Sequence, residues 1–433
     1  MLVDELKRLI ASAKEEGNHR ERARLWGELR AQFPNKASFR LNEVTSLIDA
    51  NAWSEAQDRA SEAIADFPNS VELAVAWAQT AHISFDWQVA ADRFATIRKN
   101  FPPSIYYASL ETVLSQLHCH EFMTQEREAR KLANEYWSLL RRKQFGVRPE
   151  VFLLGTLLDR RHAKEYENWI KKPIPAIYRA PFLKRMHWGK LNRAWMTKYF
   201  DDITVLSLGQ NCLPWLLPNR WGLRPKELDI SPIGPFDLFA TIGDKISEAV
   251  EGDFEPFLRE SALKQFAGLL KTPTLMNEAM QASFFHEMGN WWAADNWRRL
   301  RVSYQERIDR FKRIAETGSV LYVYCICGKN NVDALIKTYL SKLHRDNCRL
   351  LIINVLSEPV LSGTKYEQLN IVNIPYPQDY NWTYWNDYTS ERGVAFEFAI
   401  AEAIKAELQR LRPPPEPVGK WFATLRKRMD VSR

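Results

Sequence analysis

The sequence predicts an α/β protein in which an all-α solenoid of helical repeats precedes a C-terminal domain with a three-layer, mostly parallel sheet. Three observations predict this order. A Phe-Pro pair recurs at a fixed interval in the N-terminal part, a Lys- and Arg-rich stretch follows, and short apolar runs then alternate with helical stretches. The predicted boundaries are 1–136 for the repeats, 137–200 for a basic connecting segment, 201–411 for the α/β domain, and 412–433 for a Pro-rich break with a basic amphipathic tail.

The repeats are predicted from spacing. The pairs that recur every 34 residues are Phe33-Pro34, Phe67-Pro68 and Phe101-Pro102, with small residues at Ala23, Ala56 and Ala90. This period resembles that of tetratricopeptide repeats, each a pair of helices. One helix of a unit is expected to end near Phe-Pro and a second to follow, such as Val71–Ala81, while Thr124–Arg142 caps the stack. Such a solenoid implies a concave surface for a protein partner; the alternative is an internal brace.

The stretch from Trp137 to Phe200 holds 15 Lys or Arg against 4 Asp or Glu, within a chain of net charge +7. A basic surface attracts nucleic acid, anionic lipid or an acidic substrate. The chain contains none of the sequence motifs of nucleic-acid modules, so no specific nucleic-acid partner is expected. We therefore predict a solvated connecting segment, with attraction of anions as the second interpretation.

Apolar runs of strand length alternate with helical stretches in the C-terminal half. The predicted strands are Ile203–Leu208, Ala282–Phe285, Val320–Ile326, Leu350–Val355 and Ile371–Ile374. The predicted helices are Ile242–Glu251, Phe254–Leu270, Trp297–Glu316, Val332–His344 and Ser390–Leu411. Near-continuous apolar strands between helices indicate a parallel sheet covered on both faces.

Several classes of protein are disfavoured by what the chain lacks. Met1–Arg22 has no apolar core of a signal peptide, and no run reaches the length of a membrane span. Five cysteines without a framework spacing predict free thiols in the cytoplasm. The basic tail Val418–Arg433 could make weak peripheral contact with a membrane or form a loose or docked end. No nucleotide motif occurs, and neither Cys325-x-Cys327 nor His118-Cys-His120 has convincing metal-ligand spacing, so no cofactor and no metal are expected.

The stretch from Val205 to Cys212 carries the candidate chemistry. A buried strand is expected to end at Gly209, whose freedom at φ allows a tight turn. Pro214 fits the first turn of a following helix, which places Cys212 at the helix N-terminus. There the macrodipole favours a thiolate. Strand, turn and nucleophile at a helix start make up a nucleophile elbow, whereas the plainer interpretation is a buried structural cysteine.

Thiol catalysis also needs a base and a group that orients it. His286, after a predicted strand, is the candidate base, although it could be an ordinary histidine at a strand end. Asp237, held in a Gly-Pro-Phe-Asp turn, is the candidate orienting acid, with Asn354 and Asp387 as alternatives.

An oxyanion hole could form at the start of the helix. Its candidate donors are the Asn211 side chain and the N–H groups of Cys212 and Leu213.

Two aromatic clusters flank these residues. One, with Trp291 and Trp292, follows His286; the other includes Tyr380, Trp382 and Trp385. Exposed rings in loops stack on sugars or extended peptides, so we expect these side chains to bind substrate. The competing interpretation is a small core that pins a long loop.

The elbow motif also resembles a known family. The stretches that carry the resemblance are Ser207-Leu-Gly-Gln-Asn-Cys212, Trp221-Gly-Leu-Arg224 and Gly234-Pro-Phe-Asp237. They are similar to the SLGxxC…GLR…PFDW signature of a bacterial family of unknown function labelled papain-like cysteine peptidases. The similarity extends from Asp201 to Leu411, with Leu238 where the family usually has Trp. Asn211-Cys212 also resembles the Gly-Asn-Cys-Gln loop of capsule-biosynthesis acetyltransferases.

Together these observations predict a cytoplasmic, bacterial Cys-His enzyme that performs acyl transfer or hydrolysis through a thioester on Cys212. The repeats would recruit the partner or the peptide or glycan substrate. One alternative is an acyltransferase that acts on a surface glycan precursor in polysaccharide biosynthesis. Another, from a different class, is a non-enzymatic tetratricopeptide module for protein interaction.

Overall fold

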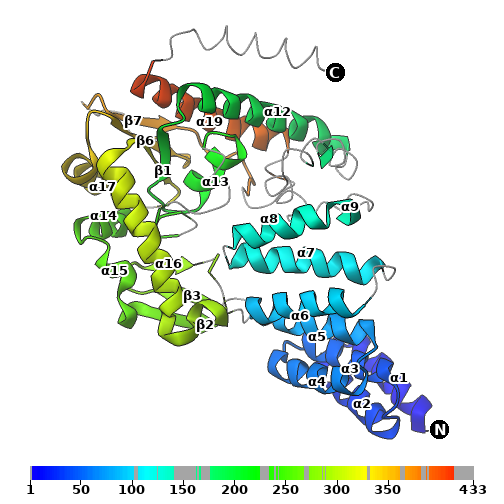
Figure 1. Ribbon diagram of the computed structural model, residues 1–433. Helices are drawn as coiled ribbons and strands as arrows, with labels where there is room; N and C mark the ends of the chain where they lie inside the picture. Colours follow the sequence, from blue (N-terminus) through cyan, green and yellow to red (C-terminus); the bar gives the residue numbers. More distant parts are fainter. Residues whose placement is uncertain are drawn as a thin grey trace. The chain divides into compact units, whose positions relative to one another are not determined.

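The computed structural model describes residues 2–101, 106–123, 125–140, 162, 165–166, 176–224, 234–237, 240–241, 243–267, 273–284, 286–287, 289–328, 332–360, 366–381, 387 and 390–413. The chain divides into two compact units (Figure 1). A helical unit consists of Met1–Trp169, Phe266–Thr274 and Glu287–Ala294. A sheet unit consists of Ile170–Gln265, Leu275–His286 and Asp295–Arg433. The chain is thus all helical at its N-terminal end and mixed α/β beyond it.

The helical unit is a succession of helices, each packed on the next along the chain. Its helices are α1 (Leu2–Glu15), α2 (His19–Gln32), α3 (Ala37–Asp49), α4 (Trp53–Asp66), α5 (Val71–Ile83), α6 (Trp87–Asn100), α7 (Tyr106–Phe122), α8 (Glu126–Glu135) and α9 (Trp137–Leu140). Contacts also link α3 to α5 and α5 to α7, so alternate helices stack along the unit.

The helices end where the Phe-Pro pairs predicted. Phe33, Phe67 and Phe101 are the residues at which α2, α4 and α6 stop, and the N–H of each closes the last turn. A proline follows each phenylalanine and cannot continue the helix. The small residues Ala56 and Ala90 are fully buried, which allows close approach of paired helices.

The sheet unit is built on a four-stranded parallel sheet. Its strands, in spatial order, are β1 (Ile203–Ser207), β5 (Ser319–Ile326), β6 (Cys348–Asn354) and β7 (Leu369–Asn373). Ser207 pairs with Val323, and Ile326 pairs with Asn354. Because the strands are parallel, their C-terminal ends share one edge, where ligands of α/β proteins commonly bind.

Helices cover both faces of this sheet. On one face the apolar core combines β1, β5 and β6 with α12 (Ala176–Tyr199), α13 (Leu213–Arg220) and α19 (Glu391–Leu411). On the other face Tyr322 of β5 contacts Phe311 of α16 (Asn290–Thr317). It also contacts Tyr339, in the π-helical turn η3 (Tyr339–Leu343) that follows α17 (Val332–Thr338). Helix α14 (Gly243–Glu251) packs on α17.

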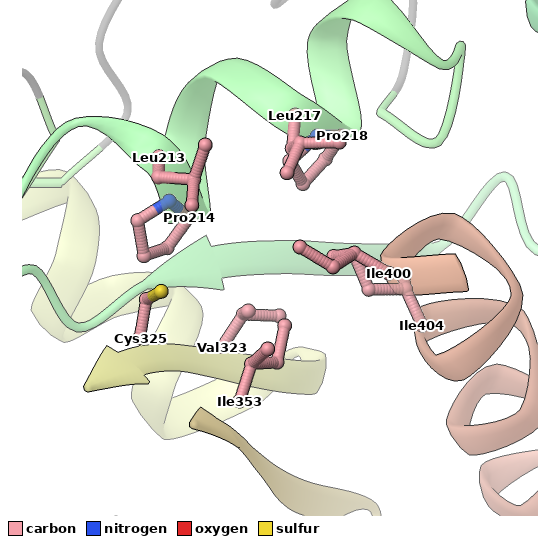
Figure 2. A pocket seen from close by; sticks show the side chains of 9 residues that line it. All are labelled: Leu213, Pro214, Leu217, Pro218, Val323, Cys325, Ile353, Ile400 and Ile404. Carbon is pink, nitrogen blue, oxygen red and sulfur yellow. The ribbon is translucent and has the colours of Figure 1, made fainter. Parts of the chain in front are cut away.

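The core beneath α13 is closely packed. Figure 2 shows side chains of α13 and α19 directed toward those of β5 and β6 around an apolar cavity of about 10 Å³. Its lining includes Leu213 and Pro214 from the first turn of α13 and Cys325 from β5. This packing fixes the helix start that carries Cys212.

The prediction of a solvated connecting segment over residues 137–200 is wrong for the last part of this stretch. That part is α12, a 24-residue helix, and the side chains of Leu191 and Trp195 are fully buried in the core of the sheet unit. The sequence concealed this helix because Lys184, Lys190 and Lys198 are exposed, whereas other residues of α12 pack on α19. Most of the preceding stretch lies outside the described residues.

A second, smaller sheet was only partly predicted. It contains β2 (Leu263–Ala267), β3 (Pro273–Asn277) and β4 (Ala282–Phe284), with β3 and β4 antiparallel. The helix expected over Phe254–Leu270 is wrong, because the described part of this stretch forms α15 (Glu255–Leu258), the 3-10 turn η2 (Glu260–Ala262) and then strand β2. The left-handed backbone of Phe254, at φ 67°, isolates this short turn from α14.

The C-terminal tail Val418–Arg433 lies outside the described residues, so its predicted membrane contact stays a prediction. Among the helices that are described, none combines the length and the apolar character of a membrane span.

Candidate functional site

The candidate site begins at a tight turn after β1. Gly209 has φ +84°, and a Cβ built on it would lie 3.3 Å from Ile246 Cδ1. Gln210 is also left-handed, at φ 69°, so the chain reverses within two residues. Cys212 is then the N-cap of α13, and its carbonyl accepts the Leu216 N–H at 2.8 Å. Strand, turn and helix start therefore form the elbow that the sequence predicted.

The structure brings the candidate nucleophile and the candidate base together. Cys212 Sγ lies 3.6 Å from His286 Nε2, a hydrogen-bonding distance for sulfur. Cys212 is 6 % exposed, and His286 is half-buried just after β4. The two residues are 74 positions apart and come from different sheets. A thiol at a helix N-terminus beside an imidazole can transfer its proton to the ring and react as a thiolate.

The predicted oxyanion donors are engaged with one another. Asn211 Oδ1 accepts the Leu213 N–H at 2.9 Å. Asn211 Nδ2 in turn donates to Cys327 Sγ at 2.7 Å. In this arrangement the Leu213 N–H and the Asn211 amide both bond to the protein itself, so these two predicted donors are not open to a substrate.

Asp237 is placed in a rigid, buried turn. Its Oδ2 accepts the Gly234 N–H at 3.2 Å and lies 3.5 Å from the Arg224 guanidinium. Asp237 is fully buried and Arg224 is 2 % exposed. These contacts join the Trp221–Arg224 stretch to the Gly234–Asp237 turn. The described partners of Asp237 are thus the turn and an arginine, and its role as the orienting acid stays a prediction.

The two alternatives to Asp237 hold loops and are not brought to His286. The amide of Asn354 donates to Glu358 O at 2.7 Å and to Asn373 Oδ1 at 2.8 Å. Asp387 Oδ2 accepts the Asn381 N–H at 3.0 Å. Each side chain therefore organises the backbone that follows a strand or precedes α19.

Those of the predicted aromatic residues that the structure describes pack against other side chains and are not exposed rings. Trp292 is 1 % exposed, so this expectation is wrong for its ring. Trp291 is half-buried and packs edge-on against Trp292, with 4.6 Å between ring centroids. Trp382 and Trp385 lie outside the described residues.

Tyr380 belongs to a small core beside α19. Its ring lies 5.0 Å from that of Phe396 and 5.9 Å from that of Tyr376. Its hydroxyl donates to Glu397 Oε1 at 3.3 Å, and Trp221 Nε1 donates to the other carboxylate oxygen at 2.9 Å. These contacts fit the loop-pinning interpretation of Tyr380, and its role in substrate binding stays a prediction.

The other thiols have settings unlike that of Cys212. Burial raises the pKa of the Cys119, Cys325 and Cys348 thiols. Among the residues that the structure describes, no group of three or more His, Cys, Asp or Glu side chains could hold a metal ion. The His118-Cys-His120 stretch is used internally, since His118 pairs with His82 and His120 with Gln116 and Gln125.

Two residues that hold the elbow, Gln210 and Cys327, were not among the predicted site residues. Gln210 Oε1 accepts the Cys327 N–H at 2.6 Å, and Cys327 Sγ is the acceptor for Asn211. In the sequence, Cys327 stands out only through Cys325, two residues earlier, as a possible pair of metal ligands. The register of β1 on β5 is the signal that could have found it, because Ser207 pairs with Val323 and both chains run on in parallel.

Comparison with protein-family models and with curated proteins finds no match to this chain.

Proposed function

We propose that the protein is a Cys-His enzyme that performs acyl transfer or hydrolysis through a thioester on Cys212. The observation that carries the proposal is the 3.6 Å contact between Cys212 Sγ and His286 Nε2. The sulfur sits at the C-terminal edge of a parallel sheet and at the start of a helix, where thiolates are stabilised. His286 would take the thiol proton and later return it to the leaving group.

The resemblance to papain-like cysteine peptidases is consistent with this chemistry and remains part of the proposal. The fold we propose is a three-layer α/β domain behind repeats of the tetratricopeptide type. Hydrolysis and acyl transfer differ only in the acceptor, which is water in one case and a hydroxyl or amine in the other. A glycan acceptor is not favoured over a peptide one, since Trp292 and Tyr380 are built into cores.

A charged groove in the helical unit supports the proposed recruitment of a protein partner. The groove has a volume of about 650 Å³ and lies between α2, α3 and α4. Its lining includes Ala23, Gly27 and Glu43. Arg30 and Arg59 both pair with Glu43, at 2.7 Å and 3.6 Å. Burial raises the pKa of the Glu43 carboxyl. The groove thus holds ion pairs whose charged side chains could pair instead with those of an extended polypeptide.

The proposal is tested by the reactivity of Cys212. We expect iodoacetamide at pH 6.5 to label Cys212 at least about tenfold faster than Cys348, because only the former has an imidazole partner. In His286→Ala the labelling profile of Cys212 should move to higher pH, and Cys212→Ser should lose the fast site. Labelling is read by mass spectrometry of peptides over pH 5 to 9.

His344→Ala is the matched control, since it removes a histidine from the same unit without touching the elbow, and its profile should equal that of the wild type. If Cys212 and Cys348 react at the same rate, or if His286→Ala leaves the profile unchanged, the enzymatic proposal fails. The non-enzymatic interaction module would then be the better account. The basis for proposing a cytoplasmic location is the set of five free cysteines without a framework spacing, which suits a reducing compartment.

A further inference from the structure

The oxyanion donor of the candidate site is already covered. In a nucleophile elbow, the backbone N–H of the residue after the nucleophile polarises the substrate carbonyl. That residue is Leu213, and its N–H donates to Asn211 Oδ1 at 2.9 Å. A substrate oxygen can use this donor only after the Asn211 side chain has moved.

The Asn211 side chain is held at its other end. Nδ2 donates to Cys327 Sγ at 2.7 Å, just beyond the C-terminal end of β5. The orientation of the amide follows from its partners, because a backbone N–H requires the carbonyl oxygen and leaves the NH₂ group for the sulfur. Cys327 is itself fixed, since its N–H donates to Gln210 Oε1 at 2.6 Å.

We propose that Cys327 is a positioning residue that latches the Asn211 amide over the Leu213 N–H and so keeps the oxyanion site of Cys212 closed at rest. This inference rests on the proposed function of Cys212. Opening breaks the Asn211–Cys327 contact and frees both the Leu213 N–H and the Asn211 amide for a carbonyl oxygen. Closing protects the thiolate from unselective attack on carbonyl compounds.

A simple helix cap is the competing account. An asparagine side chain often accepts the N–H two residues later and only steadies a turn. Under that account the sulfur of Cys327 has no influence on carbonyl chemistry at Cys212. The two accounts therefore differ in what happens when the sulfur is removed.

Two reagents that attack the same sulfur separate the accounts. Iodoacetamide alkylates the thiolate: the sulfur attacks the CH₂ carbon, a C–S bond forms and iodide leaves, without an oxyanion. With p-nitrophenyl acetate, the Cys212 thiolate attacks the carbonyl carbon, a C–S bond forms, and the C–O bond breaks as p-nitrophenolate leaves with the electron pair. The ratio of the acylation rate to the alkylation rate at Cys212 thus reports the oxyanion site and cancels changes in thiolate content.

We expect this ratio to rise by about twofold to tenfold in Cys327→Ala, the range of one net hydrogen bond. In Cys327→Ser, which keeps an acceptor at the same place, the ratio should stay within about twofold of the wild type. Cys348→Ala, which removes a buried thiol from the start of β6, should leave it unchanged. The rates are measured by mass spectrometry of the peptide that contains Cys212.

An unchanged or lower ratio in Cys327→Ala overturns the latch and supports the helix cap. If Cys327→Ala does not fold, Cys327→Val takes its place, because valine fills the space without offering an acceptor; a ratio raised above that of the Cys348→Ala control supports the latch, and an unchanged ratio overturns it. If Cys212 reacts with iodoacetamide but takes no acetyl group in the wild type or in any variant, the proposed acyl chemistry fails, and the latch fails with it. The two failures are therefore distinguishable.

Discussion

At the scale of single residues, Gly209 decides whether the elbow can form. Its backbone is left-handed, and there is little room for a side chain next to Ile246 and Phe236. A non-glycine residue in this conformation costs about 1–3 kcal/mol, and the neighbours add a packing term. The position of Cys212 thus depends on the absence of one methyl group three residues earlier.

We expect Gly209→Ala to lower the stability of the sheet unit by about 1–3 kcal/mol and to slow the labelling of Cys212. The reason is that relief of the strain moves the start of α13. Urea unfolding followed by tryptophan fluorescence and iodoacetamide labelling at pH 6.5 measure the two effects.

Gly17→Ala is the matched control, because Gly17 has a similar φ of +68° but no neighbour within 4 Å of an added Cβ. Gly17→Ala should lower stability by the backbone strain alone and leave the labelling rate of Cys212 unchanged. Fast labelling that survives in Gly209→Ala would show that the turn is not what positions the thiol.

At the scale of elements, a pair of histidines joins α5 to α7. His82 Nε2 lies 3.0 Å from His118 Nδ1, and the His82 ring packs edge-on to Trp87 at 5.4 Å. Burial lowers the pKa of both rings to about 4, and for His82 the other ring contributes as well. Both are therefore neutral in the folded protein at physiological pH.

This pair makes the helical unit sensitive to acid. An unfolded histidine titrates near 6.5, so between pH 6.5 and about 4 the unfolded chain binds more protons than the folded one. The stabilisation is fully present above pH 6.5 and is lost as the pH falls through this window. We expect the free energy of unfolding to drop by a few kcal/mol from pH 7 to pH 4.5, as measured by urea titration of helical circular dichroism.

The double variant His82→Leu/His118→Leu should lack most of this pH dependence, whereas His344→Gln in the sheet unit should retain it. Equal slopes of stability against pH in the wild type and the double variant would mean that other groups cause the acid sensitivity.

Elements with strong local signals could be predicted, and those fixed by distant contacts could not. The strand before Gly209 and the helix through Pro214 follow from local rules, and the structure places them within about a residue of the prediction. The region from Glu255 to Ala267 was misjudged, because its helical composition yields to a backbone reversal at Phe254.

The contacts of the candidate site show the same division. Cys212 and His286 could be named from their settings in the sequence. The Asn211–Cys327 contact spans 116 residues and exists only because β1 pairs with β5 in one register. No local pattern encodes such a contact, so the sequence could indicate the candidate nucleophile Cys212 but not the residue that holds its neighbour Asn211.

At the scale of the whole molecule, the candidate nucleophile and the candidate base belong to structures of unequal size. Cys212 follows a strand of the four-stranded parallel sheet, whose central strands β5 and β6 are almost wholly buried. His286 follows β4, a three-residue strand of the three-stranded sheet. Small sheets with short strands have few contacts to hold them.

This difference sets an order of events on heating. Proteins open in local units, and those with fewer buried contacts open first. We expect the small sheet to open below the temperature at which the parallel sheet unfolds, and the fast labelling of Cys212 to disappear at that lower temperature. Labelling rates measured against temperature, beside a circular dichroism melt, test this, and coincidence of the two transitions would contradict it. The candidate pair of Cys212 and His286 would then separate on warming, and the fast labelling of Cys212 would be lost while most of the protein is still folded.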